Sequence, residues 1–285
     1  SSLTSFPSDG GITLGRLGFL NITSPSSVLT MQSGNLTIQD GAHVHVSRGH
    51  LVLSGDSLFS TNHTSFTMVD RGELVLASPR TPLLHSAVPL IVGSGGSLVF
   101  STPLVLVDSG LPVVPASDLD TCRIVIGASI RMEFNTPELG TSVVCDFIIT
   151  PDGSLTMSKA GFLALPGFFK NDGLVNLNGT GETSLLLTGS SDSSGLIFLN
   201  DLSSIFLDAC PTCSNSIGTV SGTGTIALQT SPLGVDIGGL LLVPPGQIRL
   251  TPNSVGRLRG LSQVGIEMEM GSSLELVEGG YFAKG

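Results

Sequence analysis

The sequence predicts an all-β fold of the solenoid kind, in which short strands stack coil upon coil. Two observations predict it: a composition that favours strands over helices, and a short phrase that returns at a nearly constant spacing. The chain has 285 residues, of which 40% are hydrophobic, 12% are charged and 37 are glycine. Because Lys, Glu, Gln and Ala are scarce while β-branched residues, Gly and Ser abound, a helical bundle is excluded. The apolar content also excludes intrinsic disorder.

The repeated phrase is a glycine followed by a run in which apolar residues alternate with other residues. Copies lie at 34–38, 49–53, 72–76, 96–100, 153–157, 173–177, 195–199 and 224–228, and 273–276 repeats the run after a serine. The glycines of the second to fourth copies are 23 and 24 residues apart, and those of the fifth to seventh are 20 and 22 apart. A unit of this size cannot bury its own apolar face, so we expect stacked coils of about 20–24 residues.

The pattern also selects the kind of solenoid. A leucine-rich repeat needs an Asn or Cys at a fixed place, which does not recur here, and ankyrin or tetratricopeptide units need helices. A parallel β-helix remains, with strands of three to five residues and an interior of stacked Leu, Ile, Val and Phe. Acidic or amide residues precede several turn glycines, at 39–41, 70–72, 108–110, 151–153 and 171–173. We interpret them as turn formers, whose side chains cap the backbone while the glycine accepts a positive φ.

Residues 168–181, with the sequence Phe-Phe-Lys-Asn-Asp-Gly-Leu-Val-Asn-Leu-Asn-Gly-Thr-Gly, resemble a coil of the right-handed parallel β-helices of the pectin-lyase-like superfamily. That superfamily includes autotransporter passengers, haemagglutinin-type adhesins and other repetitive surface proteins. The likeness extends over most of residues 30–280. It implies a single-stranded, right-handed parallel β-helix, which we place at 21–285. The first segment is apolar at Leu3 and Phe6 and uncharged until Asp9, so we expect 1–20 to be an extended N-terminal arm. The segment 111–145 is interrupted by prolines, so we expect irregular or inserted coils there.

Several features predict an extracellular or cell-surface location. Ser1 is no initiator and no signal-type segment opens the chain, which we interpret as a mature chain after removal of a signal peptide. Four Asn-x-Ser/Thr sequons, at Asn21, Asn35, Asn62 and Asn178, are candidate N-glycosylation sites. We therefore expect covalent N-glycans.

The four cysteines are expected to form disulfides. Cys122 and Cys145 are 23 residues apart, and Cys210 and Cys213 form a C-x-x-C in a loop. The pairs Cys122–Cys145 and Cys210–Cys213 are preferred among three possible connectivities. Zinc is disfavoured, because the first pair lacks C-x-x-C spacing and no histidine lies beside it.

Charge and histidine placement argue against other partners. The net charge is −10 with 12 basic residues and no basic run, so neither nucleic acid nor an anionic membrane is an expected partner. No apolar stretch approaches the ~20 residues of a membrane span. His43 and His45 project from one strand face and His50 follows closely, yet Val44 and Val46 take the inward positions. We interpret the histidines as solvated, and expect no metal and no cofactor.

The predicted function is structural. The acidic residues are accounted for by turns, and sugar grooves usually use aromatic platforms, whereas Trp is absent and Tyr281 stands alone; we therefore predict no enzyme. We expect a subunit of an extracellular filament, appendage or wall layer that assembles head to tail with copies of itself through its solenoid edges. Leu3 and Phe6 in the arm would add a strand to a neighbour. The alternatives are a cell-surface adhesin or carbohydrate-binding rod and, third, a polysaccharide lyase or hydrolase.

Overall fold

The structure is a computed structural model that describes residues 3–6, 11–39, 41–55, 58–61, 66–69, 71–78, 90–92, 95–107, 122–134, 140–208, 215–229, 235–242, 247–250, 255–260, 265–268, 270 and 272–278. Within these ranges all regular secondary structure is β-strand, and stacked strands pair in parallel. The predicted all-β solenoid is therefore confirmed. The chain divides into two compact units, residues 1–130 and 131–285.

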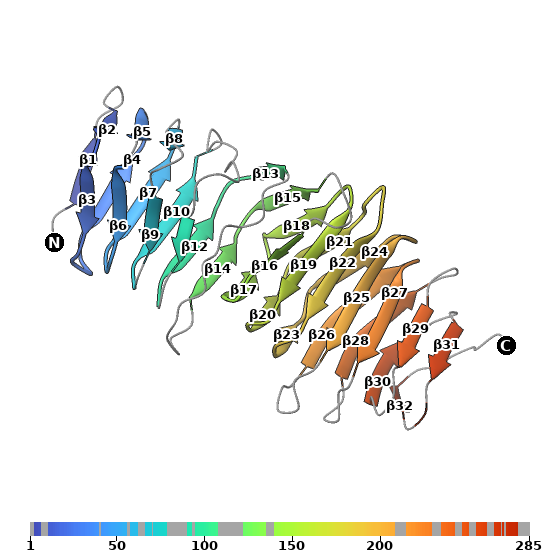
Figure 1. The fold of residues 1–285 in the computed structure, drawn as a ribbon. Coiled ribbons are helices and arrows are strands. Elements are labelled where there is room, and N and C mark those ends of the chain that lie inside the picture. Colours follow the sequence, from blue (N-terminus) through green and yellow to red (C-terminus); the bar gives the residue numbers. More distant parts are fainter. Residues whose placement is uncertain are drawn as a thin grey trace. The chain divides into compact units, whose positions relative to one another are not determined.

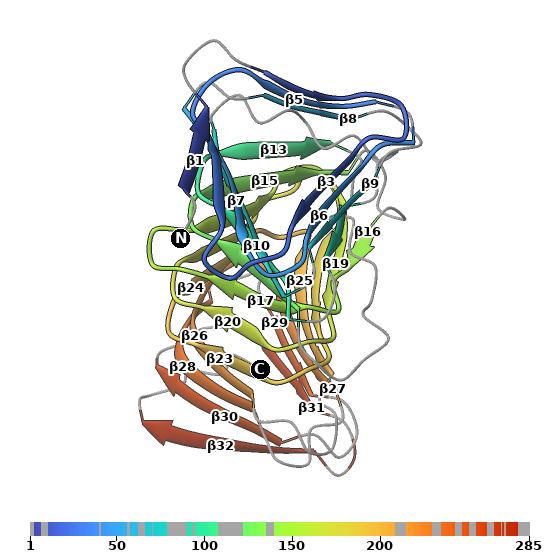
Figure 2. The ribbon, with the colours of Figure 1, turned by 90° about the vertical axis from the view of Figure 1, so that its left-hand side faces the viewer.

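The strands of the first unit form three series of parallel neighbours (Figures 1 and 2). One series contains β1 (Leu3–Phe6), β4 (Val28–Met31), β7 (His50–Ser54), β10 (Glu73–Ala77), β12 (Ser97–Phe100) and β14 (Arg123–Ile126). A second contains β2 (Ile12–Leu14), β5 (Asn35–Ile38) and β8 (Leu58–Thr61), and a third contains β3 (Phe19–Ile22), β6 (His43–Val46), β9 (Phe66–Val69) and β11 (Leu90–Val92). The unit also contains β13 (Leu104–Val107).

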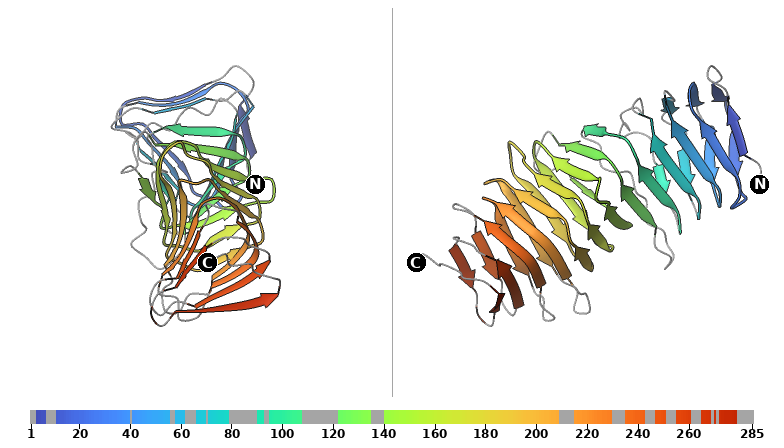
Figure 3. Two further views of the ribbon diagram at one scale, coloured as in Figure 1. Left: turned by 90° about the vertical axis from the view of Figure 1, so that its right-hand side faces the viewer. Right: turned by 180° about the vertical axis from the view of Figure 1, so that it is seen from behind.

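The second unit follows the same plan, and its strands run side by side when seen from behind (Figure 3). One sheet has seven strands, β16 (Gly140–Ser142), β19 (Gly161–Leu165), β22 (Thr183–Leu187), β25 (Ser203–Asp208), β27 (Thr225–Gln229), β29 (Gln247–Leu250) and β31 (Gly265–Met268). Another series contains β17 (Asp146–Ile149), β20 (Phe169–Asn171), β23 (Ser191–Ser193), β26 (Asn215–Gly222), β28 (Val235–Leu242), β30 (Val255–Gly260) and β32 (Ser273–Glu278). In the third, β18 (Ser154–Met157), β21 (Leu174–Leu177) and β24 (Leu196–Leu199) continue into the second halves of β26 and β28. β15 (Ser129–Glu133) spans the division between the units.

The register gives the length of each coil directly. Between the described strands, paired residues are from 18 positions apart, as in Gln247 with Gly265, to 26 apart, as in Ser97 with Arg123. The predicted 20–24 residues therefore describe the middle of the observed range. The longest coil contains the first part of the segment expected to be irregular. Within that segment, however, β14, β15 and β16 are regular strands with alternating burial.

The stretch 1–20, predicted as an extended N-terminal arm, contains strands that pair with the next coil of the same chain. β1 pairs with β4 in register, from Leu3 opposite Val28 to Phe6 opposite Met31, and β2 pairs with β5. The run Leu-Thr-Ser-Phe has the length of a coil strand, and parallel pairing satisfies backbone N–H and C=O groups that an isolated arm would leave to water. In this structure the stretch supplies strands of the first coil.

The core is a set of inward columns. On the β7–β10–β12–β14 series, Leu51, Leu74, Leu98 and Ile124 stack in register and are at most 1% exposed. Burying each such side chain contributes about 1.5–3 kcal/mol. In the second unit the rings of Phe147 and Phe169 stack with their centroids 6.5 Å apart. The inward apolar residues of each strand thus stack on those of the next coil and form a continuous apolar interior.

The glycine that opens many of the phrases is required by crowding, as at Gly49, Gly72 and Gly173. The carbonyl of Gly49 accepts a hydrogen bond from Glu73 N at 2.9 Å, and the carbonyl of Gly72 accepts one from Ser97 N at 2.9 Å. A Cβ built on Gly72 would lie 2.5 Å from Val46 O. Our expectation of a positive φ at these glycines is wrong at Gly72, where Arg71 takes the left-handed conformation (φ 57°) instead. The physical reason is the close approach of the coil beneath.

Candidate functional site

Among the turn acids that a polysaccharide-degrading site would use, Asp172 is engaged in local contacts. The carboxylate of Asp172 accepts a hydrogen bond from Ser194 Oγ at 2.7 Å and lies 3.3 Å from Lys170 Nζ. These two contacts, the Ser194 hydroxyl first, hold the pKa of Asp172 below its ordinary value, although partial desolvation raises it. Asn171 Oδ1 accepts from Gly173 N at 3.1 Å, which confirms the predicted backbone cap.

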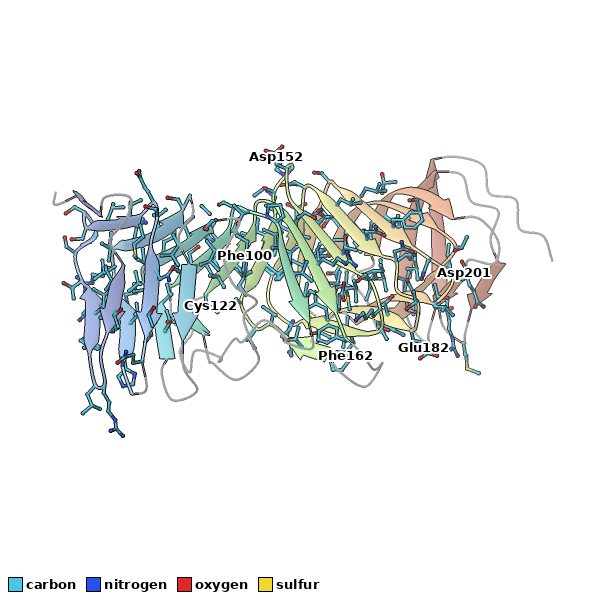
Figure 4. All side chains as sticks on the ribbon, turned by 90° about the horizontal axis from the view of Figure 1, so that it is seen from above. Phe100, Cys122, Asp152, Phe162, Glu182 and Asp201 are labelled. Atoms are coloured by element: carbon cyan, nitrogen blue, oxygen red, sulfur yellow. The ribbon has the colours of Figure 1, made fainter. Side chains whose placement is uncertain are left out.

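Elsewhere in the turns, Asp152 points outward from its turn, as do Glu182 and Asp201 from theirs (Figure 4). Asp40, Asp70 and Asp108 lie outside the described residues. In the part of the chain that the structure describes, no three His, Cys, Asp or Glu side chains gather as a metal site would require.

A cluster of charged side chains surrounds Glu133 on β15. Its carboxylate lies 2.8 Å from Arg131 Nη2 and 3.1 Å from Lys159 Nζ, while Arg131 Nε donates to Ser158 Oγ at 3.2 Å. The Glu133 side chain is only 12% exposed. Hydrogen bonding from Lys159, with the charges of Arg131 and Lys159, lowers the pKa of Glu133 against a desolvation effect that raises it. The sequence did not predict this cluster, because Lys159 lies on the next coil and the sequence does not show which residues of neighbouring coils meet.

The interior of the second unit also holds a polar ladder that was not predicted. It consists of two groups of buried hydrogen bonds between successive coils. Asn171 N donates to Ser193 Oγ at 3.1 Å, Asn171 Nδ2 donates to Leu196 O at 3.3 Å, and Ser191 Oγ donates to Asn215 Oδ1 at 3.0 Å. On the neighbouring sheet Thr183 Oγ1 donates to Ser203 Oγ at 2.9 Å. The expected interior of Leu, Ile, Val and Phe therefore needs correction at these positions.

His43 and His45 lie at the outward positions that the alternation of apolar residues along the strand predicted. Val44 and Val46 are fully buried, while His43 and His45 occupy the outward positions of β6. His50 begins β7, and its Nδ1 lies 3.3 Å from Glu73 Oε1 on the next coil. This contact gives His50 a carboxylate neighbour.

Three of the four sequons fall on described residues, and all three are exposed. Asn21 lies on β3, Asn35 begins β5, and Asn178 follows β21 in a turn. Asn62 lies outside the described residues. Glycosyl transfer requires an accessible amide, so each of these three asparagines has the exposure that the modification needs.

Of the four cysteines, Cys122 and Cys145 are both disulfide-bonded and buried. Cys210 and Cys213 lie outside the described residues. The pairing of that second couple stays a prediction.

One outward face of the first unit carries an ordered pattern, which we call the valine face. It is formed by the outward residues of β7, β10, β12 and β14. Val52, Val75, Val99 and Val125 lie in one column in register, each partly exposed. Beside it runs a second outward column of His50, Glu73, Ser97 and Arg123. A column of valines thus lies beside a column that carries an acidic side chain at Glu73 and a basic one at Arg123.

The first coil exposes large apolar side chains of its own. Leu17, in the turn between β2 and β3, is 82% exposed, and Phe19 at the start of β3 is 58% exposed. Leu17 also adopts a left-handed backbone (φ 62°), which is uncommon for a residue with a branched side chain. The predicted assembly residues Leu3 and Phe6 are the first and last residues of β1, and both pair with β4.

Comparison with known proteins gives no relative. No model of a protein family matches the chain, and neither a curated protein nor a solved structure matches it. The described residues include no helix with the length and apolar character needed to cross a bilayer. What the findings define is the class, a parallel β-solenoid.

Proposed function

We propose that this chain is a structural subunit of an extracellular filament, appendage or wall layer, and that copies assemble end to end through the edges of their coils. The observation that carries the proposal is the in-register parallel ladder, in which successive coils repeat the same backbone pairing. A stack of this kind can be extended by any coil of matching register. The likeness of the coil phrase to repetitive surface proteins of the pectin-lyase-like superfamily supports the same role and belongs to the proposal.

The proposed contact uses the first coil. Strands at the edge of a sheet offer N–H and C=O groups to another chain unless a cap covers them. Exposed Phe19 and Leu17 add apolar area beside that edge. A head-to-tail contact of this kind is heterologous and propagates without closing, which produces filaments.

The proposed location rests on the sequons and the disulfides. Disulfide-bonded Cys122 and Cys145 fit an oxidising compartment, where such bonds persist. Exposed Asn21, Asn35 and Asn178 provide acceptors for N-glycans, which would replace charge as the solubilising element of a surface with few charged residues.

Electron microscopy of protein produced through a secretory pathway tests the proposal. We expect filaments from the unaltered chain and short particles from a Leu17→Lys, Phe19→Lys variant, because two charges at the first coil oppose stacking. Val144→Lys is the matched control, since Val144 is 45% exposed but lies in the second unit. Monodisperse single particles of the unaltered chain at high concentration would overturn the proposal.

Intact mass spectrometry tests the glycans separately. We expect mass increments that disappear on enzymatic deglycosylation and that decrease in number when Asn35 or Asn178 is replaced by Gln. An unmodified mass after secretion would contradict the glycoprotein part of the proposal.

A further inference from the structure

We propose that the valine face is a lateral docking surface for the valine face of a second copy of this chain, with the two solenoids antiparallel and a two-fold axis over Val99. This inference rests on the proposed function, because it supplies the sideways contact between copies that end-to-end stacking leaves out. The argument comes from the order of residues along the two columns of the face.

The apolar column is suited to sheet-on-sheet contact. Val75, Val99 and Val125 follow one another in register, one per coil. Coils are about 4.8 Å apart, and facing sheets pack about 10 Å apart with their side chains interdigitating. Valines in one column can therefore pack against the valines of an opposing column.

The charged column determines the direction. Glu73 lies one coil before Ser97 and Arg123 lies one coil after it. A two-fold axis that lies between the two faces, over β12 and parallel to it, reverses the order of coils but keeps each column opposite itself. Glu73 of each copy then faces Arg123 of the other, and Val75 faces Val125.

Other arrangements are less favourable. An axis along the solenoid would keep the order of the coils, so Glu73 of one copy would lie level with Glu73 of the other and not with Arg123, and the opposite charges would not pair. An axis over β10 would put Glu73 against its own counterpart, where like charges repel. The arrangement centred on Val99 pairs opposite charges twice and buries the valines together.

The area of the face sets the strength of the contact. Four strands from β7 to β14 and four residues per strand give a face of about 15 Å by 13 Å. This is well below the roughly 800 Å² per partner of a stable complex, so an isolated pair is weak and salt-sensitive. Copies joined end to end repeat the contact, and avidity then stabilises it.

Charge reversal tests the proposal. Sedimentation equilibrium at high protein concentration is carried out on full-length protein carrying Leu17→Lys and Phe19→Lys, which blocks end contacts. We expect a monomer–dimer equilibrium whose dissociation constant rises at least about tenfold with Arg123→Glu or with Glu73→Arg alone. The double variant, with Glu73→Arg and Arg123→Glu together, restores association because the opposite charges face each other again.

A steric variant and a matched control complete the experiment. Val99→Lys places two ammonium groups on the axis and abolishes the dimer. Thr156→Lys, at an outward position of β18 in the second unit, leaves it unchanged. A monomer at all concentrations, or a dimer that ignores both charge reversals, would overturn the inference.

The two proposals fail in different ways. Filaments of single-solenoid width from the unaltered chain, together with a monomeric end-blocked variant, would reject lateral docking and keep end-to-end assembly. Dimers of the end-blocked variant without filaments from the unaltered chain would do the reverse.

Discussion

Replacing Gly72 with alanine tests the physical reason for the repeated glycine. A Cβ at this position would lie 2.5 Å from Val46 O, 2.7 Å from Val46 Cγ1 and 2.9 Å from Gly49 O. Two of these atoms belong to the backbone, so they cannot move aside like the end of a flexible side chain. The coils would have to separate locally, which strains the bond from Ser97 N to the Gly72 carbonyl.

The expected cost follows from two opposing effects. Overpacking a close-packed site costs about 1–3 kcal/mol. Removing glycine from the unfolded chain returns about 0.4–1 kcal/mol. With central values of about 2 and 0.7 kcal/mol, the net loss in the free energy of unfolding of Gly72→Ala is about 1.3 kcal/mol, or a fall in Tm of about 3–5 °C at about 2–4 °C per kcal/mol for a chain of this size.

Thermal unfolding followed by circular dichroism measures the effect. Gly15→Ala is the control in the same unit, because a Cβ there meets only Gln39 Oε1, at 3.9 Å. We expect its Tm to be unchanged or slightly raised. If Gly72→Ala unfolds at the wild-type temperature, or if Gly15→Ala loses as much, then close approach of the coils is not the reason for the repeated glycine.

Three further changes test the polar contacts and the disulfides. Because the folded pKa of Glu133 is lowered from 4.5, its carboxylate stabilises the fold above that pH and this contribution is lost as the pH falls through the folded value; unfolding titrations should therefore show a smaller loss of stability between pH 7 and pH 3 in Glu133→Gln than in the wild type. Asn171→Ala leaves the Gly173 amide without its acceptor, and urea unfolding should record a loss of about 1–3 kcal/mol. Replacing Cys122 and Cys145 with serine should lower the free energy of unfolding by about 2–4 kcal/mol. A reductant should lower the Tm of the wild type more than that of this double serine variant.

The features that the sequence predicted are those decided within one strand. The inward position of Val44 and the outward position of His43 follow from a period of two, and no knowledge of the neighbouring coil is needed. The spacing of the glycines likewise predicts the coil length. The fold class and the inward or outward direction of side chains could therefore be predicted from the sequence.

The features that escaped prediction depend on register between coils. Glu133 meets Lys159 across 26 residues, and Asn171 meets Ser193 across 22. A difference of two residues in either coil would separate these partners while preserving the alternation. Only the assembled stack determines which polar side chains meet.

The buried polar ladder of the second unit has a consequence for how the chain selects one structure. Sliding a strand by two residues keeps apolar side chains inside, so the hydrophobic pattern alone does not distinguish the correct register from its nearest competitors. Such a slip would break the hydrogen bonds of Asn171 with Ser193 and of Ser191 with Asn215, at a cost of about 1–3 kcal/mol for each buried polar group left unpaired. The ladder therefore favours the correct register during folding, because misaligned coils that the apolar interior alone would tolerate lose these hydrogen bonds.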